Sequence, residues 1–203
     1  MSQQKGKFIV IEGVDGCGKG TLMEHLKNVL PTNQFVFTRE PGGTPFGAEL
    51  RKLLLNNEID PVTQLLLFEA DRKRHIEEVI LPALASGKHV ISDRFDASTF
   101  AYQAETEKLQ KFFLMVNEFV IKDCRPDQYI FLDLPIEVSM ERTRTRGENT
   151  NVFENKPMAY FEGVRMRYGF FFEEVPVHFI NAEAKRELVA GQAEELIRVM
   201  CRQ

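Results

Sequence analysis

Short apolar runs recur along the chain at intervals typical of buried strands. The first, Phe8–Ile11, is continuous and ends at Glu12 and Gly13. A continuous run of this kind is typical of a parallel strand that is buried on both faces. Similar runs predict four further strands, at Phe35–Phe37, His89–Ser92, Gln128–Leu132 and Val177–Ile180.

Between these runs, apolar residues recur at helical spacing. The first such stretch runs from Lys19 to Leu30, and Pro31 stops it. A second follows the stiff loop at 40–45, and a third begins at Pro61 and ends at Gly87. Further helical sequence spans 109–121, 136–174 and about 187–201. This alternation predicts an α/β fold, with a five-stranded parallel sheet between two layers of helices and ligands bound at the carboxyl ends of the strands.

Composition and charge limit the possible functions. The chain has 203 residues, 43% of them hydrophobic, which predicts one domain over residues 1–203 with one core. A net charge of −4 argues against a protein that coats a nucleic acid. Three widely spaced cysteines indicate reduced thiols rather than a zinc site. No segment is apolar enough for a signal peptide or a membrane span, so we expect a soluble cytoplasmic protein.

A glycine-rich loop joins the first strand to the first helix. Residues 13–19, GVDGCGK, match the Gly-x-x-x-x-Gly-Lys pattern of a phosphate-binding loop (P-loop) in the required strand–loop–helix context. Backbone N–H groups would hold phosphate oxygens, and Lys19 would reach the outer phosphates. Position 20 is Gly and the hydroxyl comes at Thr21, which leaves the direct protein ligand of Mg²⁺ open. The candidate ATP-binding residues, 13–21, are Gly13, Val14, Asp15, Gly16, Cys17, Gly18, Lys19, Gly20 and Thr21.

A P-loop alone does not define the reaction. Asn155-Lys156 is followed by Pro157-Met158 rather than by the aspartate of a guanine-binding segment, which argues against a regulatory GTPase. An enzyme that transfers a phosphoryl group between two phosphorylated substrates needs arginines from separate segments. Arg39 and Arg94 both follow strands, at the edge of the sheet where such a site is expected.

Five segments carry further motifs in a fixed order. They are residues 11–19 (IEGVDGCGK), 38–44 (TREPGGT), 68–72 (FEADR), 93–103 (DRFDASTFAYQ) and 142–148 (RTRTRGE). In order and spacing they resemble the motifs of the thymidylate (dTMP) kinase family, especially its bacterial type. The resemblance covers nearly the whole chain. It implies a three-layer P-loop NTPase fold with a short lid at about residues 142–156.

The resemblance also implies roles around the phosphates. Asp15 would accept a hydrogen bond from the deoxyribose 3′-hydroxyl, and Arg39 and Arg94 would bind the substrate phosphate. Asp93 would help to organise Mg²⁺ through water, and Thr21 is a second candidate metal residue.

The base and sugar would be recognised by a second group of residues. The resemblance implies that Phe68 stacks on thymine and that Arg72 donates to its O4. Their spacing of four places both side chains on one helix face. Packing in the core is an equally good interpretation of Phe68. Thr99 and Gln103 resemble nucleotide-contacting positions, and Tyr102 resembles a ring beneath the sugar that disfavours a ribose 2′-hydroxyl.

Bacterial-type members of the family carry their catalytic arginine in the lid, whereas the eukaryotic type has an arginine inside the P-loop. The corresponding P-loop residue here is Gly16, which fits the bacterial scheme. Arg142 and Arg146 share one helix face and Arg144 points away, so the three cannot all play one role. We favour Arg146, beside the flexible Gly147, as the arginine that reaches the transferred phosphoryl group, with Arg142 as second choice. The candidate catalytic residues are Lys19, Arg94, Arg146, Arg142 and Asp15.

These features predict the Mg²⁺-assisted reaction ATP + dTMP → ADP + dTDP, as in dTTP synthesis. One alternative is a deoxynucleoside monophosphate kinase of broader specificity, since one methyl group is worth only about 1–3 kcal/mol of discrimination. Another is a non-catalytic ATP-binding switch. The helix expected at 109–121 is apolar on more than one side, so it is either central or buried in a subunit interface. The family resemblance implies a homodimer.

Overall fold

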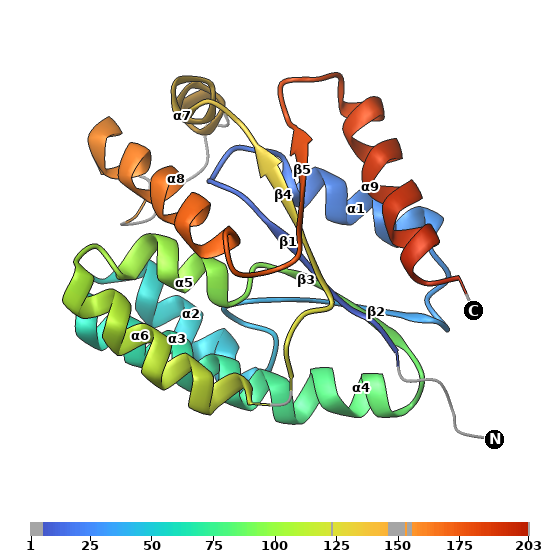
Figure 1. Ribbon diagram of the computed structural model, residues 1–203, viewed down its shortest axis with the longest axis horizontal. Coiled ribbons are helices and arrows are strands. Elements are labelled where there is room, and N and C mark those ends of the chain that lie inside the picture. The colour runs from blue at the N-terminus through green and yellow to red at the C-terminus, as the bar shows by residue number, and fades with distance from the viewer. Residues whose placement is uncertain (1–5, 123, 146–152, 154–155, 203) are drawn as a thin grey trace.

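A five-stranded parallel sheet forms the centre of the computed structural model, which describes residues 6–122, 124–145, 153 and 156–202 (Figure 1). The strand order is β2-β3-β1-β4-β5. The expected α/β fold is therefore confirmed. The strands are β1 (Phe8–Glu12), β2 (Phe35–Arg39), β3 (His89–Asp93), β4 (Gln128–Asp133) and β5 (Val177–Asn181).

Each strand continues one or two residues beyond its predicted apolar run, and always at the carboxyl end. The added residues are polar and keep the ladder register, as in the pairs Arg39 with Asp93 and Asp133 with Asn181. Hydrophobic patterning cannot detect them because they are polar, and they lie at the carboxyl ends of the strands, the edge of the sheet where ligands bind.

Helices cover both faces of the sheet (Figure 1). On one face lie α1 (Lys19–Val29) and α9 (Arg186–Met200), which contact each other. On the other lie α3 (Pro61–His75), α5 (Asp96–Gln103) and α6 (Glu107–Ile121). The remaining α-helices of the described chain are α2 (Pro45–Asn56), α4 (Leu81–Ala85), α7 (Ile136–Thr145) and α8 (Met158–Phe172). All five residues of β1 are buried, so the first strand forms the middle of the core.

The helical segment that begins at Pro61 differs from its prediction. It is not one helix, because a π-helical turn, Ile76–Ile80, separates α3 from α4. In this turn the backbone N–H of Leu81 donates to the carbonyl of Ile76, five residues back. Pro82 follows directly; it has no N–H, and its ring would clash with the carbonyl four residues before it in a regular helix. The wider turn absorbs that conflict.

Two other helices change the sequence-based interpretation. The prediction contained no helix at α5, although it placed three binding residues there. The helix is only eight residues long and buries polar as well as apolar side chains, so no polar face marks it in the sequence. In α6 the inner face carries Phe113 and Ile121, whereas Met115 is 65% and Phe119 82% exposed. This helix is therefore not central in the fold.

Candidate active site

The loop between β1 and α1 has the backbone geometry of a phosphate cradle. Gly13 and Gly16 adopt positive φ angles of 148° and 78°. A Cβ at Gly13 would lie 2.6 Å from Cys17 Sγ, and one at Gly16 would lie 2.6 Å from the carbonyl oxygen of Ser139, so glycine is required at both places. Lys19 is buried and its Nζ donates to the carbonyls of Gly13 (2.9 Å) and Val14 (3.0 Å).

Arg94 and Asp15 form an ion pair beside this loop. Arg94 follows β3 in a left-handed conformation, with φ 71°, and its Nη2 lies 2.6 Å from Asp15 Oδ1. The Tyr102 hydroxyl donates to Asp15 Oδ2 at 3.3 Å. Burial alone would raise the pKa of Asp15, but the charges of Arg94 and Lys19 outweigh it and lower the pKa below its ordinary value. Asp15 is therefore an ionised hydrogen-bond acceptor at neutral pH.

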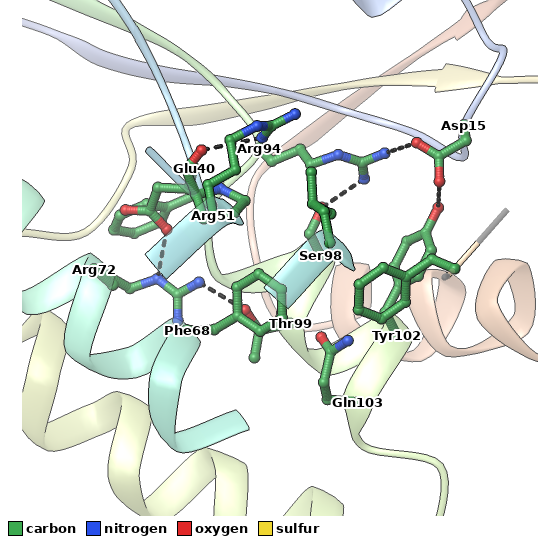
Figure 2. A pocket seen from close by; sticks show the side chains of 14 residues that line it. Asp15, Glu40, Arg51, Phe68, Arg72, Arg94, Ser98, Thr99, Tyr102 and Gln103 are labelled. Carbon is green, nitrogen blue, oxygen red and sulfur yellow. Dashed lines mark hydrogen bonds and ion pairs between the residues drawn. The ribbon is translucent and has the colours of Figure 1, made fainter. Parts of the chain in front are cut away.

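A partly open cavity lies next to this ion pair (Figure 2). Its walls come from the P-loop, α2, α3 and α5, together with the segments that follow β2 and β3. The structure thus brings together residues predicted from three separate motifs: Asp15, Phe68, Arg72, Arg94, Thr99, Tyr102 and Gln103.

Arg72 of the cavity wall is buried and held by three side-chain contacts. It is only 1% exposed, and its Nε donates to Glu40 Oε2 at 3.0 Å and its Nη2 to Thr99 Oγ1 at 2.8 Å, while Nη1 pairs with Glu69. Burial alone would lower the pKa of Arg72, but the carboxylates of Glu69 and Glu40 outweigh it and raise the pKa. Three of the five N–H groups are engaged, which leaves two for a ligand.

The position of Phe68 bears on the two interpretations of this residue. Phe68 is half-buried: one part packs against the core, and the side chain also lines the cavity next to Thr99 in Figure 2. Gln103 Nε2 lies 3.4 Å from Gln64 Oε1, at the same end of the cavity as Phe68. An aromatic face, a guanidinium and an amide thus surround one end of the cavity.

Sequence reasoning missed two charged residues of the cavity wall, Arg51 and Glu40. Arg51 of α2 donates to the Pro41 carbonyl at 3.1 Å, and burial, followed by the positive charges of Arg39 and Arg94, lowers its pKa. Arg51 lies in a leucine-rich helix, where no motif marks it. Arg39 itself is exposed at the end of β2 and does not line the cavity, unlike Arg94.

Asp93, at the carboxyl end of β3, has the chemistry of a cation-binding residue. Its Oδ1 atom is buried and has no hydrogen-bond partner among the described residues. A carboxylate oxygen of this kind fits a hard cation such as Mg²⁺ or a water bound to it. Thr21 is exposed at the start of α1. Within the described ranges, no group of three or more His, Cys, Asp or Glu side chains could hold a metal.

A second hollow also borders the P-loop. Its walls include Gly16, Gly18 and Thr21, together with Arg142 of α7 and Ala182 beyond β5. Arg142 Nη1 donates to the carbonyl of Ala182 at 3.2 Å, so this arginine faces the hollow that borders the loop.

The structure describes only part of the expected lid. Arg146 lies outside the described residues, as do 147–152 and 154–155. Phe153 is buried, lines the first cavity, and packs edge-on against Tyr102 at 6.4 Å between ring centroids.

A phosphate-binding loop bordered by an arginine-lined cavity and by a second hollow fits the class of P-loop kinases, which hold two phosphorylated ligands next to one loop. The family model described as thymidylate kinase matches residues 11–193. The chain therefore belongs to the thymidylate kinase family.

Individual thymidylate kinases match this chain over nearly their full length. The thymidylate kinase of Synechococcus sp. (strain CC9902) is 37% identical over 95% of this chain and 97% of its own. That of Paraburkholderia phytofirmans is 38% identical over 97% and 99%, respectively. That of Chlamydia felis is 39% identical over 91% and 92%. Among the described helices, none is long and apolar enough to cross a membrane.

Proposed function

We propose that this protein is a dTMP kinase, which transfers the γ-phosphoryl group of ATP to dTMP and releases ADP and dTDP. The observation that carries this proposal is the cavity in which Phe68, Arg72 and Arg94 lie together beside the P-loop (Figure 2). One end of the cavity suits a pyrimidine, and the other suits a phosphate next to the phosphoryl donor. No described feature favours the deoxynucleoside monophosphate kinase of broader specificity.

The base is recognised at the end of the cavity that holds Phe68. Its ring offers a stacking face, and the two free N–H groups of Arg72 donate to the keto oxygen O4 of thymine. Arginine has no acceptor, so it disfavours the 4-amino group of cytosine. The amide of Gln103 adds a second hydrogen-bonding group, and Thr99 keeps Arg72 in place.

The sugar and phosphate lie between the base and the P-loop. Asp15 accepts the hydrogen bond of the 3′-hydroxyl because its carboxylate is ionised, and Tyr102 closes the space beneath the sugar. Arg94 binds the phosphate, with Arg51 as a further positive charge in the same wall. Arg39 contributes through its electrostatic field, because its side chain lies outside the wall.

Phosphoryl transfer takes place at the P-loop, where ATP is held by residues 13–21. An oxygen of the dTMP phosphate attacks the γ-phosphorus in line with the leaving ADP oxygen, and Lys19 neutralises charge on the transferred group. Bound Mg²⁺ supplies additional neutralisation of the ATP phosphates, and Asp93 would hold it through water. Arg146, or Arg142 beside the loop, supplies the transition-state arginine.

The broader setting is a proposal as well. The chain acts as a single domain and as a cytoplasmic homodimer, with ATP and dTMP as its partners. The exposed apolar side chains of α6, Leu114, Met115 and Phe119, support a second copy as the cover of this face. A monomeric mass in solution at micromolar concentration would contradict the dimer.

The function is tested by measuring ADP release with a panel of monophosphates in the presence of MgATP. We expect strong stimulation by dTMP, weaker stimulation by dUMP and little by dCMP or dGMP. Equal stimulation by all four would favour the kinase of broader specificity. Slow ADP release that no monophosphate changes would favour an ATP-binding switch.

A further inference from the structure

Glu12, the last residue of β1, is a buried carboxylate that the reaction described above does not use. It has no exposed surface. Its Oε1 accepts hydrogen bonds from the backbone N–H groups of Phe95 (2.9 Å) and Ser98 (3.2 Å). Its Oε2 accepts from the hydroxyls of Ser98 (2.7 Å) and Tyr168 (3.0 Å). Four donors from the start of α5 and from α8 therefore converge on one side chain.

The two backbone contacts take the place of a missing helix cap. The N-cap residue of α5 is Phe95, whose side chain has no oxygen and makes no cap hydrogen bond. Glu12 accepts from the N–H of this residue and from that of Ser98 in the first turn, two of the groups that a helix start leaves unpaired. Since α5 carries Thr99, Tyr102 and Gln103, this contact from β1 fixes one wall of the cavity.

The two hydroxyl contacts reach Arg94. Its Nη1 donates to Ser98 Oγ at 2.9 Å and to the Tyr168 hydroxyl at 3.3 Å. Each hydroxyl has a single proton, and the two hydroxyl oxygens also lie 2.8 Å from each other, so one hydroxyl can donate to the other. Glu12 Oε2 then accepts the proton of at least one of them, and lone pairs of the hydroxyl pair are left for Arg94. The carboxylate thus orients the hydroxyl pair.

We propose that Glu12 is a positioning residue for dTMP binding: it places Arg94 through the hydroxyls of Ser98 and Tyr168, and it places α5 by capping that helix from the neighbouring strand. The inference rests on the proposed function, in which Arg94 binds the dTMP phosphate. Glu12 lies behind these residues and does not line the cavity. Its loss therefore weakens dTMP binding specifically and leaves the ATP side of the P-loop intact.

Two conservative variants and one matched control test this role. Glu12→Gln keeps the size of the side chain and the acceptor oxygen for the backbone N–H groups. Its amide, however, donates to the hydroxyls where the carboxylate accepted from them, so their lone pairs are no longer directed at Arg94. Tyr168→Phe removes one of these hydroxyls. Tyr129→Phe is the control, because it removes another buried tyrosine–carboxylate hydrogen bond, to Asp96 Oδ1 at 2.6 Å, without touching Arg94.

The readout is the KM for dTMP and the KM for ATP, each measured with the other substrate saturating, together with thermal unfolding. We expect Glu12→Gln to raise the KM for dTMP roughly 10- to 100-fold, as for a weakened charged hydrogen bond. Tyr168→Phe raises it less, and the KM for ATP stays within about twofold. An unchanged KM for dTMP in both variants, or an equal rise in Tyr129→Phe, overturns the inference.

A crystal structure of the Glu12→Gln protein separates this inference from the proposed function. If the wild-type protein shows no dTMP-dependent activity, the proposed function fails, but the position of Arg94 can still be seen. Loss of the contacts from Arg94 Nη1 to Ser98 and Tyr168 supports the positioning role. Unchanged contacts in the variant contradict it.

Discussion

Truncation of Phe68 to alanine tests whether this residue recognises the base or only fills the core. Phe68 is half-buried, with one part against the core and another on the cavity. Base–aromatic stacking is worth about 1–3 kcal/mol by alanine substitution, which corresponds to a rise of about 5- to 150-fold in the dissociation constant for dTMP. Loss of packing lowers the free energy of unfolding as well, by less than the ~3–5 kcal/mol expected for a fully buried phenylalanine.

Phe68→Leu separates these two effects. Leucine restores most of the packing at a cost below about 1.5 kcal/mol, but it offers no aromatic face. We therefore expect near-normal stability and weak dTMP binding in this variant. Leu66→Ala is the matched control, since Leu66 is on the same helix, is 45% exposed and does not line the cavity.

The assay combines calorimetric titration of dTMP with steady-state kinetics, because KM equals the dissociation constant only when substrate release is fast. The expected result is a raised dissociation constant in both Phe68 variants, with the KM for ATP unchanged. If both variants bind dTMP as the wild type does, while only Phe68→Ala is less stable, then Phe68 is a core residue and the base-recognition argument is refuted.

Three further variants test other parts of the protein, the first at Asp71, a fully buried residue of α3. Burial raises the pKa of Asp71 from 3.8 to about 6, so between these two pH values the carboxyl group is protonated in the folded protein and ionised in the unfolded chain. The free energy of unfolding should therefore fall by about 3 kcal/mol as the pH rises through that interval. Asp71→Asn should flatten this dependence in urea titrations from pH 4 to pH 8. The double variant Arg142→Ala/Arg146→Ala should lose about 10³- to 10⁵-fold in turnover, measured by single-turnover kinetics, with dTMP binding retained. Asp93→Asn should raise the Mg²⁺ concentration for half-maximal rate, by about 10- to 100-fold if it acts on metal-bound water.

Each of these variants has an outcome that contradicts the reasoning behind it. An unchanged pH dependence in Asp71→Asn would mean that the buried carboxyl ionises as freely in the folded protein as in the unfolded chain. Wild-type turnover in the double arginine variant would remove the catalytic arginine from the lid. An unaltered Mg²⁺ requirement in Asp93→Asn would exclude this residue from the metal site.

Local patterning is sufficient to predict the strands and most helices of this chain, because a buried parallel strand and an amphipathic helix both leave a periodic signal. Patterning fails at the carboxyl ends of the strands, where the residues are polar. It also fails at α5, a short helix that is buried on several sides. The π-helical turn before Pro82 is a local conflict that periodicity does not detect.

The site was predictable only as far as its motifs extend. The P-loop and many residues of the cavity wall follow from motifs. That these residues lie close together in the fold depends on contacts between distant segments. Glu12 and Phe95 are 83 residues apart, and Arg72 and Glu40 are 32 apart, so no local pattern links them. Arg51 carries no signal at all among the leucines of α2.

The most direct test of the central claim follows the phosphorus atoms themselves. Purified protein, MgATP and dTMP are mixed, and ³¹P NMR spectra are recorded over time. A dTMP kinase converts ATP and dTMP into equal amounts of ADP and dTDP, with no inorganic phosphate. ADP that appears with inorganic phosphate and unchanged dTMP, or no reaction at all, would contradict the assignment of the Phe68–Arg72–Arg94 cavity as the acceptor site.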